Sequence, residues 1–328
     1  MRIACIGSEA ETRELLPELR ALWQRVPGGT PFQSPAWLLA WWKHFGTGAP
    51  RVLTARAGEG LVGVLPLYLL DEPGVRKLLP IGIGLSDYID ALVDPTWPEA
   101  GEAMLAAIAD VPDWDECHLP DLPEAGVLHG ISGPAGLAED RRDGEPCPVL
   151  MLPESTDALD AAVPRKTLRD LRQAAARAEA AGGVWIEGAD GDTLQSMLDD
   201  LFRLHEARWR TRGEPGVLGD PAVRAFHREA APALAAEGML RLYRLRIGEA
   251  VAAVYYGFAW HGRAYAYIGG FDPTMPRLSP GALILRHAIG AAIAEGCAEF
   301  DFLRGGESYK YAWGAVDRRN VARTWRRT

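Results

Sequence analysis

The amino-acid sequence predicts an α/β (α+β) fold with two tandem domains, each a mixed, mostly antiparallel sheet flanked by helices. Its 328 residues are about the length of two domains, and 48% of them are hydrophobic, enough for two cores. Strand patterns and amphipathic helix patterns follow one another in a similar order in each half. A short internal repeat supports the division, because YIDALVDPTWP at 88–98 resembles AYIGGFDPTMP at 266–276.

The first half is predicted to contain a strand, two helices, a strand-rich stretch, a small-residue helix and a short strand. These elements are expected at 3–6, 11–25, 32–46, 51–93, 95–110 and 117–119. Ser34 is placed as an N-cap before Pro35, and the tryptophans that follow are expected to pack in a core. Prolines and glycines then interrupt the chain, so we divide the domains at 1–155 and 156–328.

The second half is predicted to begin with a basic helix that ends at a pair of glycines. A strand, two helices, three antiparallel strands, a helix and a last strand follow. They are expected at 164–183, 184–187, 193–212, 221–237, 240–248, 250–260, 263–271, 282–296 and 298–303.

Composition narrows the class of protein. A net charge of −9 argues against a general nucleic-acid binder, which needs a positive surface. The four cysteines and seven histidines show no metal-binding spacing, so we expect no metal and reduced, buried thiols. No apolar stretch suits a signal peptide or a membrane-spanning helix. We therefore expect a cytoplasmic protein, with peripheral membrane contact left open.

The loop from Arg277 to Ala282 precedes an apolar helix and predicts an anion site. Pro280 and Gly281 stand at the helix start, where free backbone N–H groups and the positive end of the helix dipole can hold a phosphate. Arg277 adds a fixed positive charge, and Ser279 lies within the same turn.

These residues resemble the phosphate loop of the GNAT acyltransferase superfamily. That loop has Gln or Arg, two residues, Gly, one residue, then Gly or Ala; Pro280 departs from it. The stretch DFLRGGESYKYAWG at 301–314 resembles more specifically the CelD-like, Fem-related branch, which has two tandem GNAT-like domains. The resemblance implies acyl-CoA as co-substrate, bound by Arg277, Ser279, Pro280, Gly281 and Ala282.

The resemblance implies an N-acyltransferase that moves an acyl group from acyl-CoA to an amine by direct attack in a ternary complex. Ile268 and Gly269 stand where family members use backbone N–H groups to polarise the acyl carbonyl. Tyr309 stands where the family often has the phenol that protonates the leaving thiolate. Lys310 could bind a phosphate or a carboxylate of the donor.

Further candidate residues follow from side-chain chemistry and spacing alone, without the resemblance. Asp301 lies in an apolar strand, where it is either a base or an ion-pair partner. His205, Arg208 and Trp209 can meet on one helix; His205 is a candidate base, and the other two are candidate acceptor contacts. Apolar residues around Tyr255 would suit a long acyl chain, although core strands look the same.

The first half is expected to have lost donor binding. Glu99 and Glu102 fall opposite the phosphate loop in the internal repeat, and their carboxylates would repel a pyrophosphate. We assign Asp87 and Tyr88 to an acceptor cleft between the domains, with Asp87 holding or deprotonating the amine. A turn cap is the simpler explanation of Asp87.

Two other functions stay open. One is a Fem-type transferase that uses aminoacyl-tRNA in cell-wall synthesis, for which the basic helix containing Arg165 and Arg177 is the best support. The other is a non-catalytic acyl-CoA-binding scaffold in polysaccharide biosynthesis. The acceptor of the favoured acyltransferase could be an envelope lipid, a sugar amine or an amino acid. Nothing in the sequence predicts an oligomeric state.

Overall fold

The computed structural model describes residues 1–211 and 213–327, which form two compact units. The first unit contains residues 1–146 together with the chain from residue 318 onwards, and the second contains residues 147–317. The expected boundary at residue 155 therefore lies nine residues too late. The last strand, β15 (Val316–Arg326), lies in a stretch that was assigned to the second half without a predicted strand, yet it pairs with β8 (Glu116–Pro123) of the first unit.

The first unit holds a four-stranded antiparallel sheet in the order β1-β3-β4-β7. Its strands are β1 (Arg2–Ile6), β3 (Val52–Ala57), β4 (Gly60–Leu65) and β7 (Leu92–Val93). The helices α1 (Glu9–Arg25), η1 (Pro31–Gln33) and α2 (Pro35–Phe45) connect β1 to the next strands, and α3 (Glu99–Ala106) with η2 (Ala107–Asp110) follows β7. Ser34 caps α2 as predicted, with its hydroxyl accepting from the Trp37 N–H at 3.2 Å.

Further strands of the first unit belong to the same sheet as β15, in the order β15-β8-β6-β5-β2. They are β2 (Ala49–Pro50), β5 (Leu67–Glu72), β6 (Val75–Pro80) and β8 (Glu116–Pro123). β9 (Ala138–Met151) begins in this unit, and its last residues belong to the second one. The core beneath these strands is apolar and includes Trp114 and Trp325, each at most 1% exposed.

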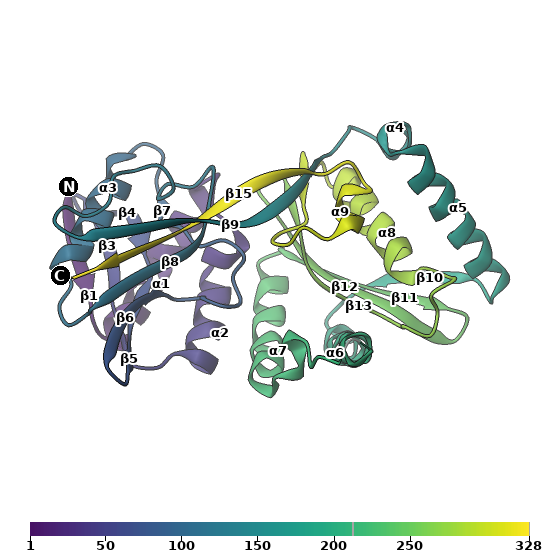
Figure 1. The fold of residues 1–328 in the computed structure, drawn as a ribbon, viewed down its shortest axis with the longest axis horizontal. Coiled ribbons are helices and arrows are strands. Elements are labelled where there is room, and N and C mark those ends of the chain that lie inside the picture. The colour runs from purple at the N-terminus through teal and green to yellow at the C-terminus, as the bar shows by residue number, and fades with distance from the viewer. Residues whose placement is uncertain (212, 328) are drawn as a thin grey trace. The chain divides into compact units, whose positions relative to one another are not determined.

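The second unit is a sheet with helices on both faces (Figure 1). Its strands run in the order β10-β11-β12-β13-β14. α6 and α7 cover one face, and α8 with α5 covers the other. The elements are α4 (Thr156–Ala162), α5 (Arg165–Ala180), β10 (Val184–Gly188), α6 (Leu194–Arg210), η3 (Val217–Gly219), α7 (Pro221–Ala236), β11 (Leu240–Ile247), β12 (Ala250–Trp260), β13 (Arg263–Phe271), α8 (Pro280–Ala294), β14 (Glu299–Asp301) and α9 (Ser308–Tyr311).

β13 and β14 are parallel neighbours over a short distance only. Residues 263–265 of β13 pair with residues 299–301 of β14, where β14 ends. β13 continues to Phe271 with β12 as its strand partner on the other side. Over 266–271 the two parallel strands part, which leaves one backbone edge of β13 without a strand partner among the described residues. This opening positions the candidate site.

The internal repeat is present in three dimensions. Each four-strand order, β1-β3-β4-β7 and β10-β11-β12-β13, has two helices after its first strand and one after its last. In both DPT turns the aspartate, Asp94 or Asp272, accepts hydrogen bonds from the backbone and hydroxyl of the threonine two residues later. Two tandem domains of mixed, mostly antiparallel sheets flanked by helices are thus confirmed.

Some expectations were wrong. β15 and α4 were not predicted, β9 was expected only as a short strand at 149–152, and Cys5 is exposed whereas the other three cysteines are buried. The helix expected at 193–212 ends at Arg210, and Arg212 itself lies outside the described residues. The other helices and strands expected in the second half are present within a few residues.

Candidate active site

The turn before α8 has a backbone conformation that aims its N–H groups outward. Ser279, the N-cap, has a left-handed conformation with φ 46° and ψ 51°, and the following residue is helical. Such an alternation forms a concave backbone surface that binds anions. Pro280 contributes no N–H, so the N–H of Gly281, in the first helical turn, is the next donor available to a ligand.

Two arginines meet beside this turn. The Nε of Arg177, in the last turn of α5, donates to the carbonyl oxygen of Arg277 at 2.7 Å. Arg177 thereby fixes the loop and brings a second guanidinium to the start of α8. The sequence showed Arg177 only as part of a basic helix, because its contact partner lies 100 residues away.

The open edge of β13 presents backbone donors to the same region. The Asp272 N–H donates to the Ala252 carbonyl at 2.8 Å, so alternate residues before it, Gly270 and Ile268, also face β12. The N–H groups of Gly269 and Phe271 then face the open side. Gly269 can therefore polarise a carbonyl placed there, whereas the N–H of Ile268 is directed to β12.

Two glycines near this edge have packing roles. A Cβ on Gly270 would lie 2.8 Å from the backbone nitrogen of His205, so glycine permits α6 to approach β13 closely. The register shift between β12 and β13 lies opposite Gly257, where a Cβ would collide with Tyr265. This irregularity lies just before Ile268 and Gly269 on β13.

Phe271 connects the helix start with α6. A Cβ on Gly281 would lie 3.0 Å from the Phe271 ring, so the ring packs directly against the first turn of α8. The guanidinium carbon of Arg208 lies 4.6 Å from the centroid of the same ring. Tyr309 is close enough to Arg208 for the guanidinium to act on its phenol. The structure thus brings Gly281 and Arg208 together around Phe271, and Tyr309 lies within electrostatic range of Arg208.

The Tyr309 phenol is protonated at neutral pH. Burial, reinforced by the Glu307 carboxylate, raises its pKa to about 12, against a smaller opposing effect of Arg208. The side chain is nevertheless 47% exposed and packs edge-on against Phe302 at 6.3 Å. A reachable, protonated phenol at this place can donate a proton.

Lys310 is a structural residue in this fold. It is 2% exposed, and its ammonium donates to the carbonyl oxygens of Leu303, Arg304 and Gly305 at 3.1, 2.7 and 2.9 Å. It also pairs with Glu307 at 2.9 Å. With its three protons engaged, Lys310 is not available as a phosphate ligand.

Asp301 shapes the same loop. Its carboxylate accepts from the Leu303 N–H at 2.8 Å, and Leu303 has a positive φ of 57° that this bond helps to hold. Asp301 as a whole is 4% exposed at the end of β14. Of the two roles considered, structural pairing fits this geometry better than catalysis.

His205 is not the near-neutral base that its sequence position indicated. It is 3% exposed, and burial together with Arg208 and Arg224 lowers its pKa to about 4. Its Nδ1 has no hydrogen-bond partner among the described residues. Trp209 lies beside it, with ring centroids 5.8 Å apart. The imidazole is therefore neutral at physiological pH, and its Cε1 lies beside Gly216.

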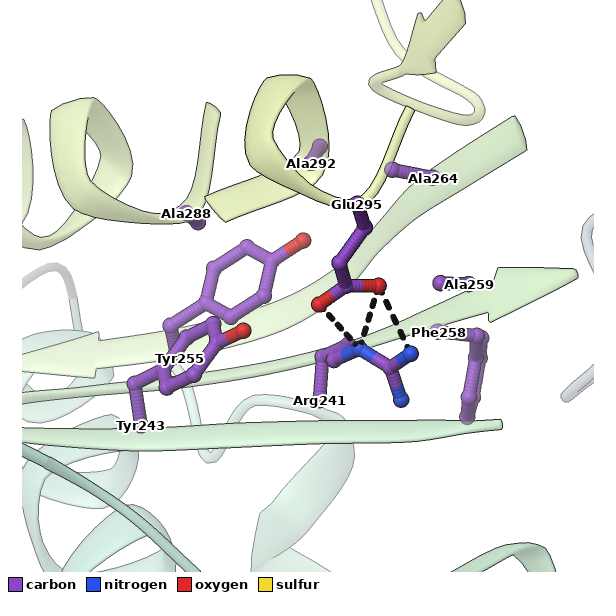
Figure 2. A pocket seen from close by; sticks show the side chains of 9 residues that line it. All are labelled: Arg241, Tyr243, Tyr255, Phe258, Ala259, Ala264, Ala288, Ala292 and Glu295. Carbon is purple, nitrogen blue, oxygen red and sulfur yellow. Dashed lines mark hydrogen bonds and ion pairs between the residues drawn. The ribbon is translucent and has the colours of Figure 1, made fainter. Parts of the chain in front are cut away.

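Tyr255 lines a small cavity on the opposite face, under α8 (Figure 2). The cavity has a volume of about 10 Å³, which is room for one water molecule rather than a long acyl chain. The Tyr255 hydroxyl lies 3.3 Å from the Tyr265 carbonyl oxygen. The expected apolar channel around Tyr255 is therefore closed among the described residues.

Residues 165–311 match the sequence model of the family described as "Acetyltransferase (GNAT) domain". This region of the chain belongs to the GNAT superfamily. The matched GNAT region contains α5 to α9, and with them the phosphate loop, the open edge of β13 and Tyr309. No curated protein matches the sequence.

The whole chain also has the fold of Fem-related and tandem GNAT proteins. The crystal structure of FemX aligns with a TM-score of 0.68 at 14% identity, covering 98% of this chain and 97% of that one. A tandem GNAT protein from the clavulanic acid biosynthesis pathway gives 0.51 at 14%, covering 98% of each chain. The C-terminal domain of a protein described as a lysylphosphatidylglycerol synthetase from Agrobacterium fabrum gives 0.60 at 11%, covering 95% and 91%.

The first unit carries the remaining predicted residues. Tyr88 is 7% exposed and packs edge-on against Phe32, and the Asp87 carbonyl accepts from the Asn320 side chain at 3.3 Å. Asp87 and Tyr88 belong to a different compact unit from Tyr309, so their roles as acceptor contacts stay predictions. Neighbouring Asp90, which belongs to the same SDYID stretch, accepts three backbone N–H bonds, from Ala91, Val127 and Leu128.

The start of α3 differs from that of α8. Glu99 and Glu102 stand in its first turn, as the repeat predicted. Val127 packs so closely on Gly101 that a Cβ there would collide with it. At the start of α3, two carboxylates and the Val127 side chain thus occupy the place where the corresponding turn before α8 is open to a phosphate.

Two properties of the described residues complete the site. No three His, Cys, Asp or Glu side chains among them lie close enough together to hold a metal ion. No helix within 1–211 and 213–327 is long and apolar enough to cross a bilayer.

Proposed function

We propose that this GNAT protein is an N-acyltransferase that moves an acyl group from acyl-CoA to an amine by direct attack. The observation that carries the proposal is the parting of β13 and β14 directly beside the start of α8, with Tyr309 and Arg208 at the same opening. Backbone donors, a basic loop and a protonated phenol are the groups that thioester aminolysis needs.

The donor would bind through its pyrophosphate at the Ser279–Gly281 turn, with Arg277 and Arg177 as counter-charges. Its carbonyl oxygen would then face the N–H groups of Gly269 and Phe271. The amine nitrogen attacks the carbonyl carbon, the carbon–sulfur bond breaks and the thiolate takes a proton from Tyr309. Tyr309 regains that proton from solvent.

The acceptor would enter on the α6 side as a neutral amine. A histidine with a pKa of about 4 is a weak base at neutral pH, so His205 would accept a hydrogen bond from the amine and position it. The proton that the amine loses after the attack would leave to water. Arg208 and Trp209 would contact the acceptor beside it.

The acceptor class is a prediction in its own right. We keep an envelope lipid, a sugar amine and an amino acid, with Asp87 and Tyr88 as further contacts. The structural likeness to a protein described as a lysylphosphatidylglycerol synthetase supports the lipid option and, with it, peripheral membrane contact. A cytoplasmic location, where CoA thioesters are made, fits the proposal.

The test is calorimetry and native mass spectrometry with acetyl-CoA, followed by an amine screen that detects the released CoA thiol and the N-acyl product. Arg277→Glu should weaken acetyl-CoA binding at least about tenfold, because it places a negative charge beside the pyrophosphate. Arg319→Glu, the same change at an exposed arginine of the first unit, is the matched control. Binding without any product would instead support the scaffold function.

A Fem-type transferase that uses aminoacyl-tRNA is the second candidate. The alignment with FemX over nearly the whole chain favours it, as do the exposed basic residues of α5, Arg165, Lys166, Arg169 and Arg172. A bulk tRNA pool distinguishes the two. Binding of tRNA that is lost in Arg165→Glu, with no binding of acetyl-CoA, would replace the first proposal by this one.

A further inference from the structure

A continuous row of aromatic side chains lies on the α8 face of the sheet in the second unit. Successive ring centroids are 5.8, 6.5, 5.1 and 6.3 Å apart. The members of this aromatic row are Tyr243, Tyr255, Phe300, Phe302 and Tyr309. The three inner rings are 6%, 1% and 2% exposed, so they are packed core side chains.

The row ends at the small cavity beneath α8. Figure 2 shows Tyr243 and Tyr255 stacked there, with Ala288 and Ala292 above them on α8. Arg241 and Glu295 border the cavity with hydrogen bonds of 2.7 to 2.9 Å. The remaining volume of about 10 Å³ accommodates one water molecule, so the alanines leave no room for an alkyl chain.

The direction of the acyl group follows from the geometry of the attack. With the donor carbonyl at the open edge of β13, the amine arrives from the α6 side, where His205 and Arg208 lie. The acyl substituent must then extend away from the amine, into the wedge between β13 and β14. Phe302 directly follows β14 and borders this wedge, and behind it Phe300 and Tyr255 are closely packed.

We propose that the aromatic row limits the donor to acetyl-sized acyl groups, with Phe302 as the side chain that sets this limit. The inference rests on the proposed acyl-CoA function and names the donor class for that site. It replaces the expectation, based on the apolar residues around Tyr255, that the donor carries a long acyl chain.

The first experiment compares acetyl-CoA with octanoyl-CoA by calorimetry on the full chain. We expect octanoyl-CoA to bind at least about tenfold more weakly. A site able to bury the chain would behave in the opposite way, because each buried methylene strengthens binding about fourfold. Equal or tighter binding of octanoyl-CoA overturns size selection and leaves the donor assignment intact.

The second experiment enlarges the wedge. Phe302→Ala should strengthen octanoyl-CoA binding at least about tenfold relative to acetyl-CoA, and Phe302→Leu, which is less disruptive to folding, should do so to a smaller degree. Phe226→Ala is the matched control, because Phe226 is fully buried in α7 on the opposite face. An equal gain in the control would overturn the role of Phe302.

A third outcome separates the two proposals. If neither acetyl-CoA nor octanoyl-CoA binds the wild-type chain, the acyl-CoA function fails and size selection fails with it. If both bind with the same affinity, only the size selection fails.

Discussion

Tyr309 is the side chain whose chemistry the site depends on most. Its pKa of about 12 keeps the phenol protonated across the physiological range, so the proton needed by a leaving thiolate is always present. Its backbone is anchored by the next residue, Lys310, through carbonyl groups of the preceding loop. A proton donor of this kind contributes to turnover rather than to donor binding.

We therefore expect Tyr309→Phe to lower kcat about 10²-fold while KM for acetyl-CoA changes little. Tyr311→Phe is the control, since its hydroxyl donates to Asp317 at 2.8 Å and it lies on the same short helix. Steady-state rates of CoA release, with the amine found in the screen, measure both. Equal losses in the two variants would remove Tyr309 from the mechanism.

Asp90 predicts a pH dependence of stability. Burial raises its pKa from 3.8 to about 7, against the lowering effect of the backbone N–H bonds from Leu128, Val127 and Ala91. Between about pH 4 and pH 7 the unfolded chain releases this proton and the folded chain keeps it. Its contribution to stability therefore falls as pH rises through that window.

In Asp90→Asn the free energy of unfolding should change less between about pH 5 and about pH 8 than in the wild type. Urea unfolding at the two pH values measures the difference. Asp192→Asn, at an exposed aspartate, should keep the wild-type pH dependence. An unchanged slope in Asp90→Asn would mean that another group titrates.

The loop between β14 and α9 is an element built around one buried cation. Leu303 and Gly305 both have positive φ values, and the Lys310 ammonium holds the carbonyl groups of this strained stretch. Without the ammonium, three carbonyl oxygens and Glu307 would lose their partner. The loop that leads from Phe302 to Tyr309 depends on it.

Lys310→Met should destabilise the second unit by about 3 kcal/mol, because buried acceptors left without a donor are costly. Lys166→Met, at an exposed lysine of α5, should have almost no effect. Chemical denaturation measures both. A stable Lys310→Met variant that no longer binds acetyl-CoA would restore Lys310 as a donor ligand.

The close contact between α6 and β13 depends on the lack of a side chain at Gly270. Gly270→Ala should destabilise the second unit by about 1–3 kcal/mol, since its Cβ would lie 2.8 Å from the His205 nitrogen and 3.0 Å from the Leu204 Cβ. Gly130→Ala is the control, because a Cβ there would have no neighbour within 4 Å. Thermal unfolding compares the two, and similar melting temperatures would contradict the tight contact.

For the whole chain, we expect one molecule of acetyl-CoA to bind per chain. The acidic first turn of α3 and the packing of Val127 on Gly101 disfavour a second site in the first unit. Native mass spectrometry counts bound molecules directly. A second bound molecule that persists in Arg277→Glu would show that the first unit also binds the donor.

How much of the fold could be predicted depended on how far apart in the sequence the contacting residues lie. The helix at 280–294, its N-terminal turn and the three strands before it follow from local patterns and from Pro and Gly, and the sequence predicted them. β15 was missed because its sequence, VDRRNVARTWR, is highly charged. Arg323 is buried only because Glu139, 184 residues away, pairs with it at 2.7 Å.

The candidate site, too, was predicted only as far as local sequence patterns reach. Arg277, Gly281 and Tyr309 stand in recognisable local motifs, and the GNAT assignment that followed from them is confirmed. The low pKa of His205, the engaged ammonium of Lys310 and the contribution of Arg177 all arise from partners that only tertiary structure supplies. Sequence patterns identify residue types at a site, whereas the charge state and free hydrogen-bonding capacity depend on packing.

The pairing of β15 with β8 has a consequence for synthesis on the ribosome. The first unit is discontinuous in sequence, because the whole second unit is encoded between residues 146 and 318. The second unit can therefore be finished while the first still lacks a strand. The N-terminal part of the chain emerges first and is the last to be completed, so a translation stop after residue 317 would leave the second unit intact and the first one open.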